Sequence, residues 1–241
     1  MEQPPVLAGM SAPAPTTAKH LSALYGRLFA SLAAPKRAVL KYRPYICPLA
    51  ELLDYVPEGA TVFDAGCGCG LLLLALASAG RRISGVGIDT DGGAIRAARL
   101  AARTPEIAGS GSTLSFETAG GTEAWPEARF DVVSLIDVLH HVPPAGQRGF
   151  LAAAAARVRP GGILIYKDMC RRPLWRAGAN RLHDLLLARQ WIHCRQISEA
   201  LEWSISMGLK PQCRRDFARL WYGHELCVFR KTEAESGRSG R

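Results

Sequence analysis

The stretch Thr61-Val62-Phe63-Asp64-Ala65-Gly66-Cys67-Gly68-Cys69-Gly70 decides the fold of this 241-residue chain. Val62 and Phe63 favour a buried strand, and Asp64 stands where that strand would meet solvent. The glycines that follow allow a tight turn with accessible peptide groups, and residues 71–79 are typical of a helix that Gly80 ends. A strand, a glycine turn and the start of a helix together indicate a nucleotide-binding site.

The turn does not fit the dinucleotide fingerprint G-x-G-x-x-G. Its third glycine, Gly70, comes one residue early, and Leu71 occupies the expected place. A glycine turn alone is weak evidence for any particular ligand. The identity of the nucleotide must therefore come from the rest of the chain.

Length and composition place the chain in a broad class. The length fits one α/β domain, and a hydrophobic content of 48% is enough for a sizeable core. Seven cysteines are scattered without metal-ligand spacing, which predicts free thiols, a reducing cytoplasmic location and no metal site. The first twenty residues lack the pattern of a signal peptide, and the longest apolar run, 71–79, is far shorter than the roughly 20 residues that span a bilayer.

The net charge of +9 is unevenly distributed. Residues 1–156 contain 13 Lys and Arg and 13 Asp and Glu, whereas residues 157–241 contain 17 and 8. This asymmetry either indicates an anionic partner of the C-terminal third or reflects an arginine-rich surface in water.

The N-terminal part is predicted to be a tail followed by a helical cap. Residues 1–18, rich in Pro, Ala, Ser and Thr, are expected to be disordered. The cap, residues 19–56, is expected to hold an amphipathic helix over 19–34 and a second helix that begins at Pro48 and ends near Tyr55. Between them, residues 41–45 are both basic and aromatic, and we expect this segment, including Tyr42, to hold a ligand carboxylate.

The main domain is predicted over residues 57–231, with a polar tail over 232–241. Beyond the first strand and helix, strands are expected over 83–88, 114–117, 130–136, 163–166, 209–214 and 222–230, and helices over 93–102, 145–158 and 198–207. This alternation predicts an α/β, Rossmann-like, seven-stranded, mostly parallel sheet with helices on both faces and an antiparallel last strand. Ligands are expected at the C-terminal ends of its strands.

Asp89 ends the second predicted strand, 23 residues after Gly66. A carboxylate at this place can accept both hydrogen bonds of a ribose diol. Asp89, Thr90 or Asp91 also suits the N-cap of the helix that follows. We assign Asp89, the strand-end residue, to the ribose and place Thr90 in the same site.

With these motifs in order, the chain resembles the class I S-adenosylmethionine-dependent methyltransferases, in the small-molecule branch (methyltransferase type 11/12-like). The resemblance covers about residues 56–170. The early third glycine fits this family, whose cofactor has no pyrophosphate to place on the helix. The motifs are residues 62–70, Gly87-Ile88-Asp89, Phe130-Asp131-Val132-Val133 with Leu139-His140-His141, and Val158-Arg159-Pro160-Gly161-Gly162.

The resemblance implies a site for S-adenosylmethionine. The glycine turn would cradle the methionine part, Asp89 would bind the ribose hydroxyls, and the end of the fourth strand would line the pocket near the methyl group. Many members carry an acidic residue after the third strand that reads the adenine; Gly120 occupies that place here, which leaves backbone groups or Glu123 for this task. The predicted cofactor residues are Asp64, Ala65, Gly66, Cys67, Gly68, Gly70, Asp89, Thr90, Gly120, Ile136, Asp137, Val138 and Tyr42.

Methyl transfer to an alcohol needs a general base, and four residues at strand ends are candidates. His140 and His141 follow the fourth strand, and Lys167 and Asp168 follow the fifth. Histidine has a pKa suited to the task, although such histidines also serve only to line a pocket or to pack. Lys167 and Asp168 alternatively pair with each other.

Residues 170–195 are predicted to form a helical insertion, and the resemblance implies that such an insertion after the fifth strand roofs the substrate. The segment contains six arginines and one acidic residue, with leucines and tryptophans on its apolar side. This pattern suits a lipophilic acceptor with a carboxylate or phosphate, an anionic membrane surface or a carrier protein. It equally suits an amphipathic helix that packs on the core with its arginines in water.

The chain is therefore predicted to transfer a methyl group from S-adenosylmethionine to a small anionic or lipophilic acceptor. One alternative is an RNA methyltransferase, suggested by the basic last third, although no recognisable RNA-binding module is present. Another is a binding module without catalysis, against which the intact glycine turn and Asp89 argue. Neither the oligomeric state nor the atom that is methylated follows from the sequence.

Overall fold

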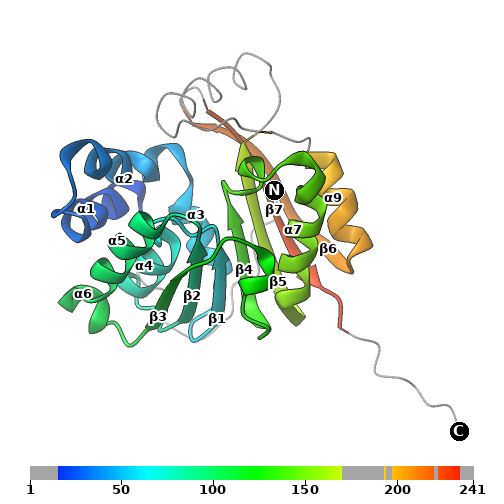
Figure 1. Ribbon diagram of the computed structural model, residues 1–241, viewed down its shortest axis with the longest axis horizontal. Helices are drawn as coiled ribbons and strands as arrows, with labels where there is room; N and C mark the ends of the chain where they lie inside the picture. Colours follow the sequence, from blue (N-terminus) through cyan, green and yellow to red (C-terminus); the bar gives the residue numbers. More distant parts are fainter. Residues whose placement is uncertain (1–15, 170–192, 194–196, 220–221, 234–241) are drawn as a thin grey trace, which may run out of the picture.

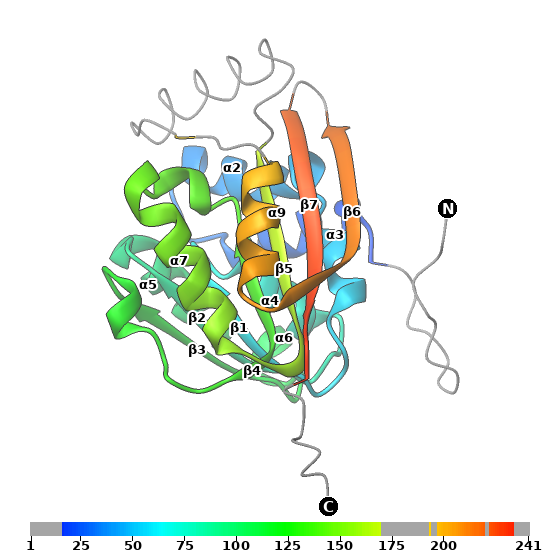
Figure 2. The ribbon, with the colours of Figure 1, turned by 90° about the vertical axis from the view of Figure 1, so that its right-hand side faces the viewer.

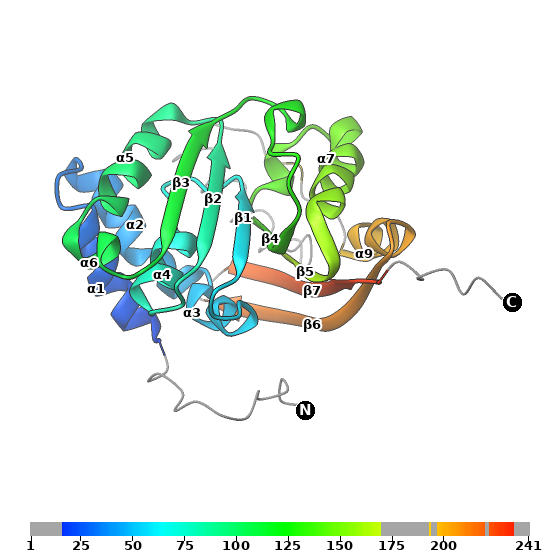
Figure 3. The same cartoon turned by 90° about the horizontal axis from the view of Figure 1, so that it is seen from below.

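The computed structural model describes residues 16–169, 193, 197–219 and 222–233. Its centre is a seven-stranded sheet in the order β3-β2-β1-β4-β5-β7-β6, with helices on both faces (Figures 1 and 3). Strands β1 to β5 pair in parallel, whereas β7 is antiparallel to both β5 and β6. The predicted fold class is confirmed, including the antiparallel last strand.

Strands β1 to β4 are close to those predicted, because hydrophobic runs bounded by turn residues mark them in the sequence. The strands are β1 (Thr61–Ala65), β2 (Ser84–Asp89), β3 (Thr113–Thr118), β4 (Phe130–Ile136), β5 (Val158–Met169), β6 (Leu209–Arg219) and β7 (Tyr222–Lys231). The helices that cover the sheet are α4 (Leu71–Ser78), α5 (Gly92–Ala102), α6 (Pro105–Ala108), α7 (Pro144–Arg157) and α9 (Ile197–Ser206), with short 3₁₀ turns η2 (Thr122–Ala124) and η3 (Leu139–His141).

Alternate residues of the central strands face two separate cores, as expected for a sheet covered on both sides. Val62 and Val132 pack with α1, α4 and α5 on one face. Phe63 and Val133 pack with α7 and α9 on the other, and Figure 2 shows these two helices together in front of the sheet. Burial of each such aliphatic or aromatic side chain contributes about 1.5–3 kcal/mol to the stability of the fold.

The helical cap is arranged differently from the prediction. Helix α1 (Ala18–Leu28) begins at a Thr17 cap and ends six residues before the predicted boundary, and the chain then turns into a second helix, α2 (Ala34–Ile46). Pro35, in the first turn of α2, favours a new helix start over continuation of α1. The helix predicted from Pro48 is split into α3 (Leu49–Leu52) and the 3₁₀ turn η1 (Leu53–Tyr55).

Strand β5 is longer than predicted. Phe130 of β4 pairs with Val158 and Val132 pairs with Ile163, so the predicted turn over residues 159–162 forms an irregularity within the strand. Gly161 has φ +75°, a conformation that suits glycine at this point. At its other end β5 is extended by antiparallel pairing with β7, up to the pair Met169 and His224. Such long-range pairing has no local signature in the sequence.

Several predictions fall on residues that the structure does not describe. The predicted tails lie mostly there, and of the predicted insertion over 170–195 only His193 is described. Within the described ranges, every helix is too short or too polar to cross a membrane. The described cysteines, Cys47, Cys67, Cys69, Cys213 and Cys227, are free thiols.

Candidate active site

A cavity of about 1150 Å³ opens at the carboxyl ends of β1, β2, β3 and β4. Cap helix α2 forms one wall, and the start of α7 forms another. The described residues that line it are Lys36, Val39, Leu40, Arg43, Cys47, Leu49, Asp64, Gly66, Cys67, Gly68, Cys69, Leu71, Leu72, Ile88, Asp89, Thr90, Asp91, Ala94, Ala119, Gly120, Gly121, Thr122, Glu123, Trp125, Ile136, Asp137, Val138, His141, Val142, Pro143, Gly146, Gly149, Phe150 and His193.

The glycine turn forms the floor of the cavity between β1 and α4. The backbone N–H groups of Gly66 and Cys67 donate to Ile88 O over 2.8 and 2.9 Å, which fastens the turn to β2. A Cβ atom on Gly66 would lie 2.3 Å from Cγ2 of Val138, so no larger residue fits there. A Cβ on Gly68 would meet no atom within 4 Å, although its φ of +54° favours glycine. The turn therefore presents bare backbone to the cavity.

Asp64, at the end of β1, is a buried carboxyl group in the wall of the cavity. Its Oδ1 atom accepts a 2.6 Å hydrogen bond from Ser134 Oγ on the neighbouring strand β4. Burial raises the pKa of Asp64 to about 7, because desolvation outweighs the Ser134 hydrogen bond. A cationic ligand group beside this carboxyl would restore its ionised form.

Asp89, at the end of β2, braces the glycine turn. Its two carboxylate oxygens accept from Gly68 N over 2.7 Å and from Asp91 N over 2.8 Å. Asp91 is the residue that caps α5, since its side chain accepts from Gly93 N over 2.7 Å. Asp89 therefore remains at the cavity with the further acceptor capacity that a carboxylate has.

Asp137, at the end of β4, is the centre of a buried ionic cluster. Arg43 Nη2 of α2 lies 2.6 Å from Oδ2, and Lys167 Nζ of β5 lies 2.5 Å from Oδ1. Burial alone would raise the pKa of Asp137, but the charges of Lys167 and Arg43 outweigh it and hold that pKa well below its ordinary value. Nearby, burial and then the Lys167 charge lower the pKa of His224 to about 3, which keeps its ring neutral.

A histidine pair follows on the 3₁₀ turn η3. His140 is buried, and its Nδ1 atom contacts Oδ1 of Asp168, which also accepts from Met169 N over 2.7 Å. His141 lines the cavity, and its ring centroid lies 4.1 Å from that of His140. The carboxylate of Asp168 thus orients His140, and His140 in turn supports the ring that faces the cavity.

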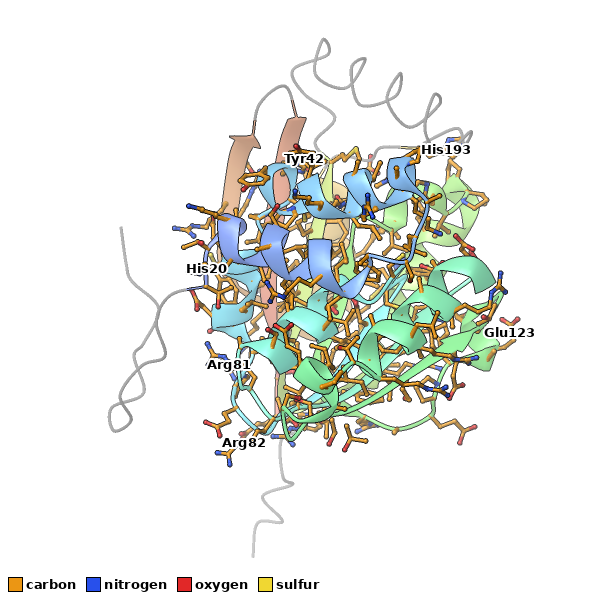
Figure 4. All side chains as sticks on the ribbon, turned by 90° about the vertical axis from the view of Figure 1, so that its left-hand side faces the viewer. His20, Tyr42, Arg81, Arg82, Glu123 and His193 are labelled. Atoms are coloured by element: carbon orange, nitrogen blue, oxygen red, sulfur yellow. The ribbon has the colours of Figure 1, made fainter. Side chains whose placement is uncertain are left out.

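Gln147 of α7 holds a third histidine at the same wall. Its buried amide nitrogen lies within hydrogen-bonding distance of the carbonyl oxygens of Leu139, Val142 and His193, at 3.1, 3.0 and 3.0 Å. His193 N also donates to His140 O over 2.8 Å. His193, labelled at the upper right of the ribbon in Figure 4, is therefore fixed beside the η3 turn and contributes to the cavity lining.

Comparison with known proteins identifies the family. A family profile described as methyltransferase domain matches residues 39–206, more than half of the chain. The chain belongs to the class I S-adenosylmethionine-dependent methyltransferases. The ubiquinone biosynthesis O-methyltransferase of Alkalilimnicola ehrlichii is 34% identical over 127 residues, which cover 50% of this chain and 49% of that protein. The chain spans about half the length of the curated relatives it matches.

Solved methyltransferases share the fold at low sequence identity. A Burkholderia thailandensis 1,6-didemethyltoxoflavin-N1-methyltransferase, solved with 1,6-didemethyltoxoflavin and S-adenosylhomocysteine, has a TM-score of 0.60 at 21% identity and covers 95% of this chain and 94% of its own. Magnesium protoporphyrin IX methyltransferase from Synechocystis, solved with bound SAH, has a TM-score of 0.65 at 17% identity, with coverage of 87% and 94%. These likenesses concern the fold.

Most of the predicted cofactor residues come together at the cavity. Those that line the cavity are Asp64, Gly66, Cys67, Gly68, Asp89, Thr90, Gly120, Ile136, Asp137 and Val138, and Glu123 joins them. Ala65 and Gly70 support the turn from outside the lining. Tyr42 is 60% exposed on the outer side of α2 and is not among the lining residues.

The four predicted base candidates are separated by the structure. His141 lines the cavity, whereas His140, Lys167 and Asp168 are buried behind it. The suggested pair of Lys167 with Asp168 does not form, because Lys167 contacts Asp137 and Asp168 contacts His140. Adjacent residues of a strand point to opposite faces, which sends these two side chains to different partners.

Sequence reasoning missed Gln147 and His193, and within the segment 41–45 it named Tyr42 where Arg43 lines the cavity. Arg43 belongs to the basic aromatic segment at residues 41–45, but only the helical register of α2 shows that residue 43, not residue 42, faces the cavity. Gln147 and His193 are far apart in the sequence and meet only through the fold. A buried glutamine on a helix has no local sequence signal for such a role.

Proposed function

We propose that this chain catalyses S-adenosylmethionine-dependent O-methylation of a small organic acceptor. The observation that carries the proposal is that His141 shares one cavity with the glycine turn and Asp89. A group able to take up a proton thus lies in the same space as the residues expected to hold the methyl donor. The similarity to ubiquinone biosynthesis O-methyltransferases supports oxygen as the methylated atom. That similarity extends over about half the length of those proteins.

The cavity residues fit the cofactor. The bare backbone at Gly68 leaves room for the methionine part, the Asp64 carboxyl suits an ammonium group, and Asp89 suits a ribose diol. Arg43, fixed by Asp137, brings a guanidinium to the opposite wall, where it suits a carboxylate. When bound, S-adenosylmethionine supplies a methyl group activated by a sulfonium centre.

His141 is the proposed general base. Methylation of a neutral hydroxyl releases one proton, and a ring nitrogen of His141 would accept it as the new oxygen–carbon bond forms. Asp168 orients His140, whose ring packs against His141 and would limit its movement. Gln147 ties together the carbonyl groups on either side of His141, so the turn that carries the base is held rigidly.

The acceptor is proposed to combine a lipophilic part with a hydroxyl or an anionic group. One wall of the cavity carries the cations Lys36 and Arg43. Apolar surface comes from both sides, from α2 and from the start of α7. The apolar side chains that line the cavity include Val39, Leu40, Val142 and Phe150.

Incubation with methyl-labelled S-adenosylmethionine and separate pools of phenols, hydroxylated lipids, amines and tRNA tests the proposal. We expect label in the phenol or lipid pool and equimolar S-adenosylhomocysteine. Label in tRNA would replace the proposal by an RNA methyltransferase. If no S-adenosylhomocysteine forms with any pool or with cell extract while the cofactor still binds, the chain is a binding module without catalysis.

A further inference from the structure

The outer face of helix α2 carries apolar side chains, where a surface helix normally presents polar ones. Tyr42 is 60% exposed, Val39 45% and Tyr45 40%, and these are three of the five large hydrophobic side chains that are exposed in the described part of the chain. A spacing of three residues places them along one side of the helix. The rings of Tyr42 and Tyr45 lie 6.3 Å apart between centroids, so they form one patch.

The same helix is strongly basic. Between Ala34 and Ile46 it holds Lys36, Arg37, Lys41 and Arg43 and no Asp or Glu. Arg43 is engaged with Asp137, and Arg37 donates to Ala30 O over 3.0 Å while remaining exposed. Helical spacing places Lys41 beside the tyrosines on one flank and Lys36 beyond Val39 on the other. Apolar side chains flanked by cations are typical of helices that lie in a membrane interface.

This face continues into the wall of the active-site cavity. Lys36, Leu40 and Arg43 line the cavity, and Val39 belongs to both the lining and the exposed patch. Figure 4 views the cap from outside, with Tyr42 labelled near its upper edge. A surface that α2 rests on would therefore lie next to the mouth of the cavity.

We propose that α2 docks the protein onto an anionic lipid bilayer, with Val39, Tyr42 and Tyr45 in the interface and Lys36 and Lys41 near the headgroups. The partner is inferred from charge complementarity. A helix with four cations and no acid attracts anionic lipids and repels a second copy of itself. Tyrosine favours the boundary between headgroups and acyl chains. A lipophilic acceptor would then reach the cavity directly from the bilayer. The docking itself does not depend on methyl transfer.

Sedimentation of the full chain with vesicles tests the proposal. We expect binding to vesicles of phosphatidylcholine with 30% phosphatidylglycerol, little binding to pure phosphatidylcholine, and loss of binding in 0.5 M salt. The double variant Tyr42→Ser/Tyr45→Ser should bind vesicles about tenfold more weakly than the wild type, although its net charge is unchanged. Lys36→Gln/Lys41→Gln should weaken binding roughly tenfold to thirtyfold.

Matched controls separate this face from the general positive charge of the chain. Leu100→Ser/Ile205→Ser removes two equally exposed apolar side chains elsewhere, and Arg103→Gln/Lys210→Gln removes two exposed cations. Both should bind vesicles within about threefold of the wild type. Circular dichroism checks that each variant is folded. If a variant is not folded, quenching of the tryptophan fluorescence of Tyr42→Trp by brominated lipid reports contact of α2 with the bilayer.

Two results would overturn the proposal. The first is binding that the α2 variants reduce no more than the controls do, or that is equal on neutral vesicles. The second is failure to bind vesicles together with a concentration-dependent dimer that Tyr42→Ser/Tyr45→Ser abolishes. That outcome would assign the face to a second copy of the chain.

Discussion

Arg43 donates from Nη2 to Oδ2 of Asp137 over 2.6 Å, and this contact joins cap helix α2 to the end of β4. The other oxygen of Asp137 contacts Lys167 of β5, and the Asp137 backbone has φ +52°, a left-handed conformation that Asp tolerates better than most residues. Two walls of the cavity are therefore tied to one buried carboxylate.

Loss of Lys167 should destabilise the fold strongly. Lys167→Met removes a fully buried partner of Asp137, and we expect the free energy of unfolding in urea to fall by about 3 kcal/mol. Arg159→Gln is the matched control, because it breaks a more exposed ion pair with Asp131 and should cost less than about 1 kcal/mol. Equal losses in the two variants would mean that the Asp137 cluster has no special role in stability.

Asp89 should contribute mainly to cofactor affinity. Asp89→Ala removes the carboxylate proposed to bind the ribose and one brace of the glycine turn, so we expect S-adenosylhomocysteine to bind about 10–100-fold more weakly. Asp54→Ala, at a highly exposed carboxylate, is the control and should leave the affinity unchanged. Calorimetric titration measures both. Unchanged affinity in Asp89→Ala would remove the ribose assignment.

Asp64 should make cofactor affinity depend on pH. Its pKa in the free protein is about 7 because of burial, and a bound ammonium group favours the ionised carboxylate. Below pH 7 a proton must leave before binding, so we expect the Kd of S-adenosylhomocysteine to rise up to about tenfold per pH unit as pH falls. Asp64→Asn should abolish this slope between pH 5.5 and 7. The same slope in both proteins would contradict the role of Asp64.

The same carboxyl should oppose stability at neutral pH. A carboxyl whose pKa is raised in the folded state keeps a proton that the unfolded chain, at an ordinary pKa of 3.8, has lost. Its contribution to stability is therefore present below about pH 4 and is lost as pH rises to 7. Without cofactor, Asp64→Asn should unfold at higher urea concentration than the wild type at pH 8, with a gain of roughly 1–3 kcal/mol. A loss of stability at pH 8 would be the contrary result.

Removal of His141 should affect turnover and leave cofactor binding intact. We expect His141→Ala to lower kcat by about 10²–10⁴-fold on the acceptor found by labelling, with S-adenosylhomocysteine affinity within about threefold. Added imidazole should restore part of the rate, which a purely structural defect would not allow. His20→Ala, at the exposed surface of α1, is the control. Full activity of His141→Ala would exclude it as the base.

The central fold could be predicted because its signals are local. Thr61–Ala65 combines a strand pattern with a following glycine turn, and Asp89 lies at the end of a second such strand. Because neighbouring parallel strands end at the same edge of the sheet, these two strand ends lie close together regardless of how the helices pack. The cofactor side of the cavity follows from these elements, and most of its predicted residues line it.

The remainder of the site depends on contacts that no short stretch encodes. Helix α2 has only one buried residue, Pro44, so its pattern lacks the apolar stripe that usually reveals a helix. Without that helix, residues 42 and 43 could not be told apart as outward and inward. The separation of Lys167 from Asp168 required the pairing of β5 with both β4 and β7. His193 is held at the cavity by long-range contacts with Gln147 and with the carbonyl oxygen of His140.

Calorimetric titration of the full chain with S-adenosylmethionine and with S-adenosylhomocysteine tests the cofactor site most directly. We predict that both bind at one site per chain and compete with each other, and that NAD does not displace them, because the glycine turn lacks the dinucleotide pattern. If neither ligand gives a heat of binding and the two do not compete, in a protein shown to be folded by circular dichroism, the proposed cofactor site is contradicted.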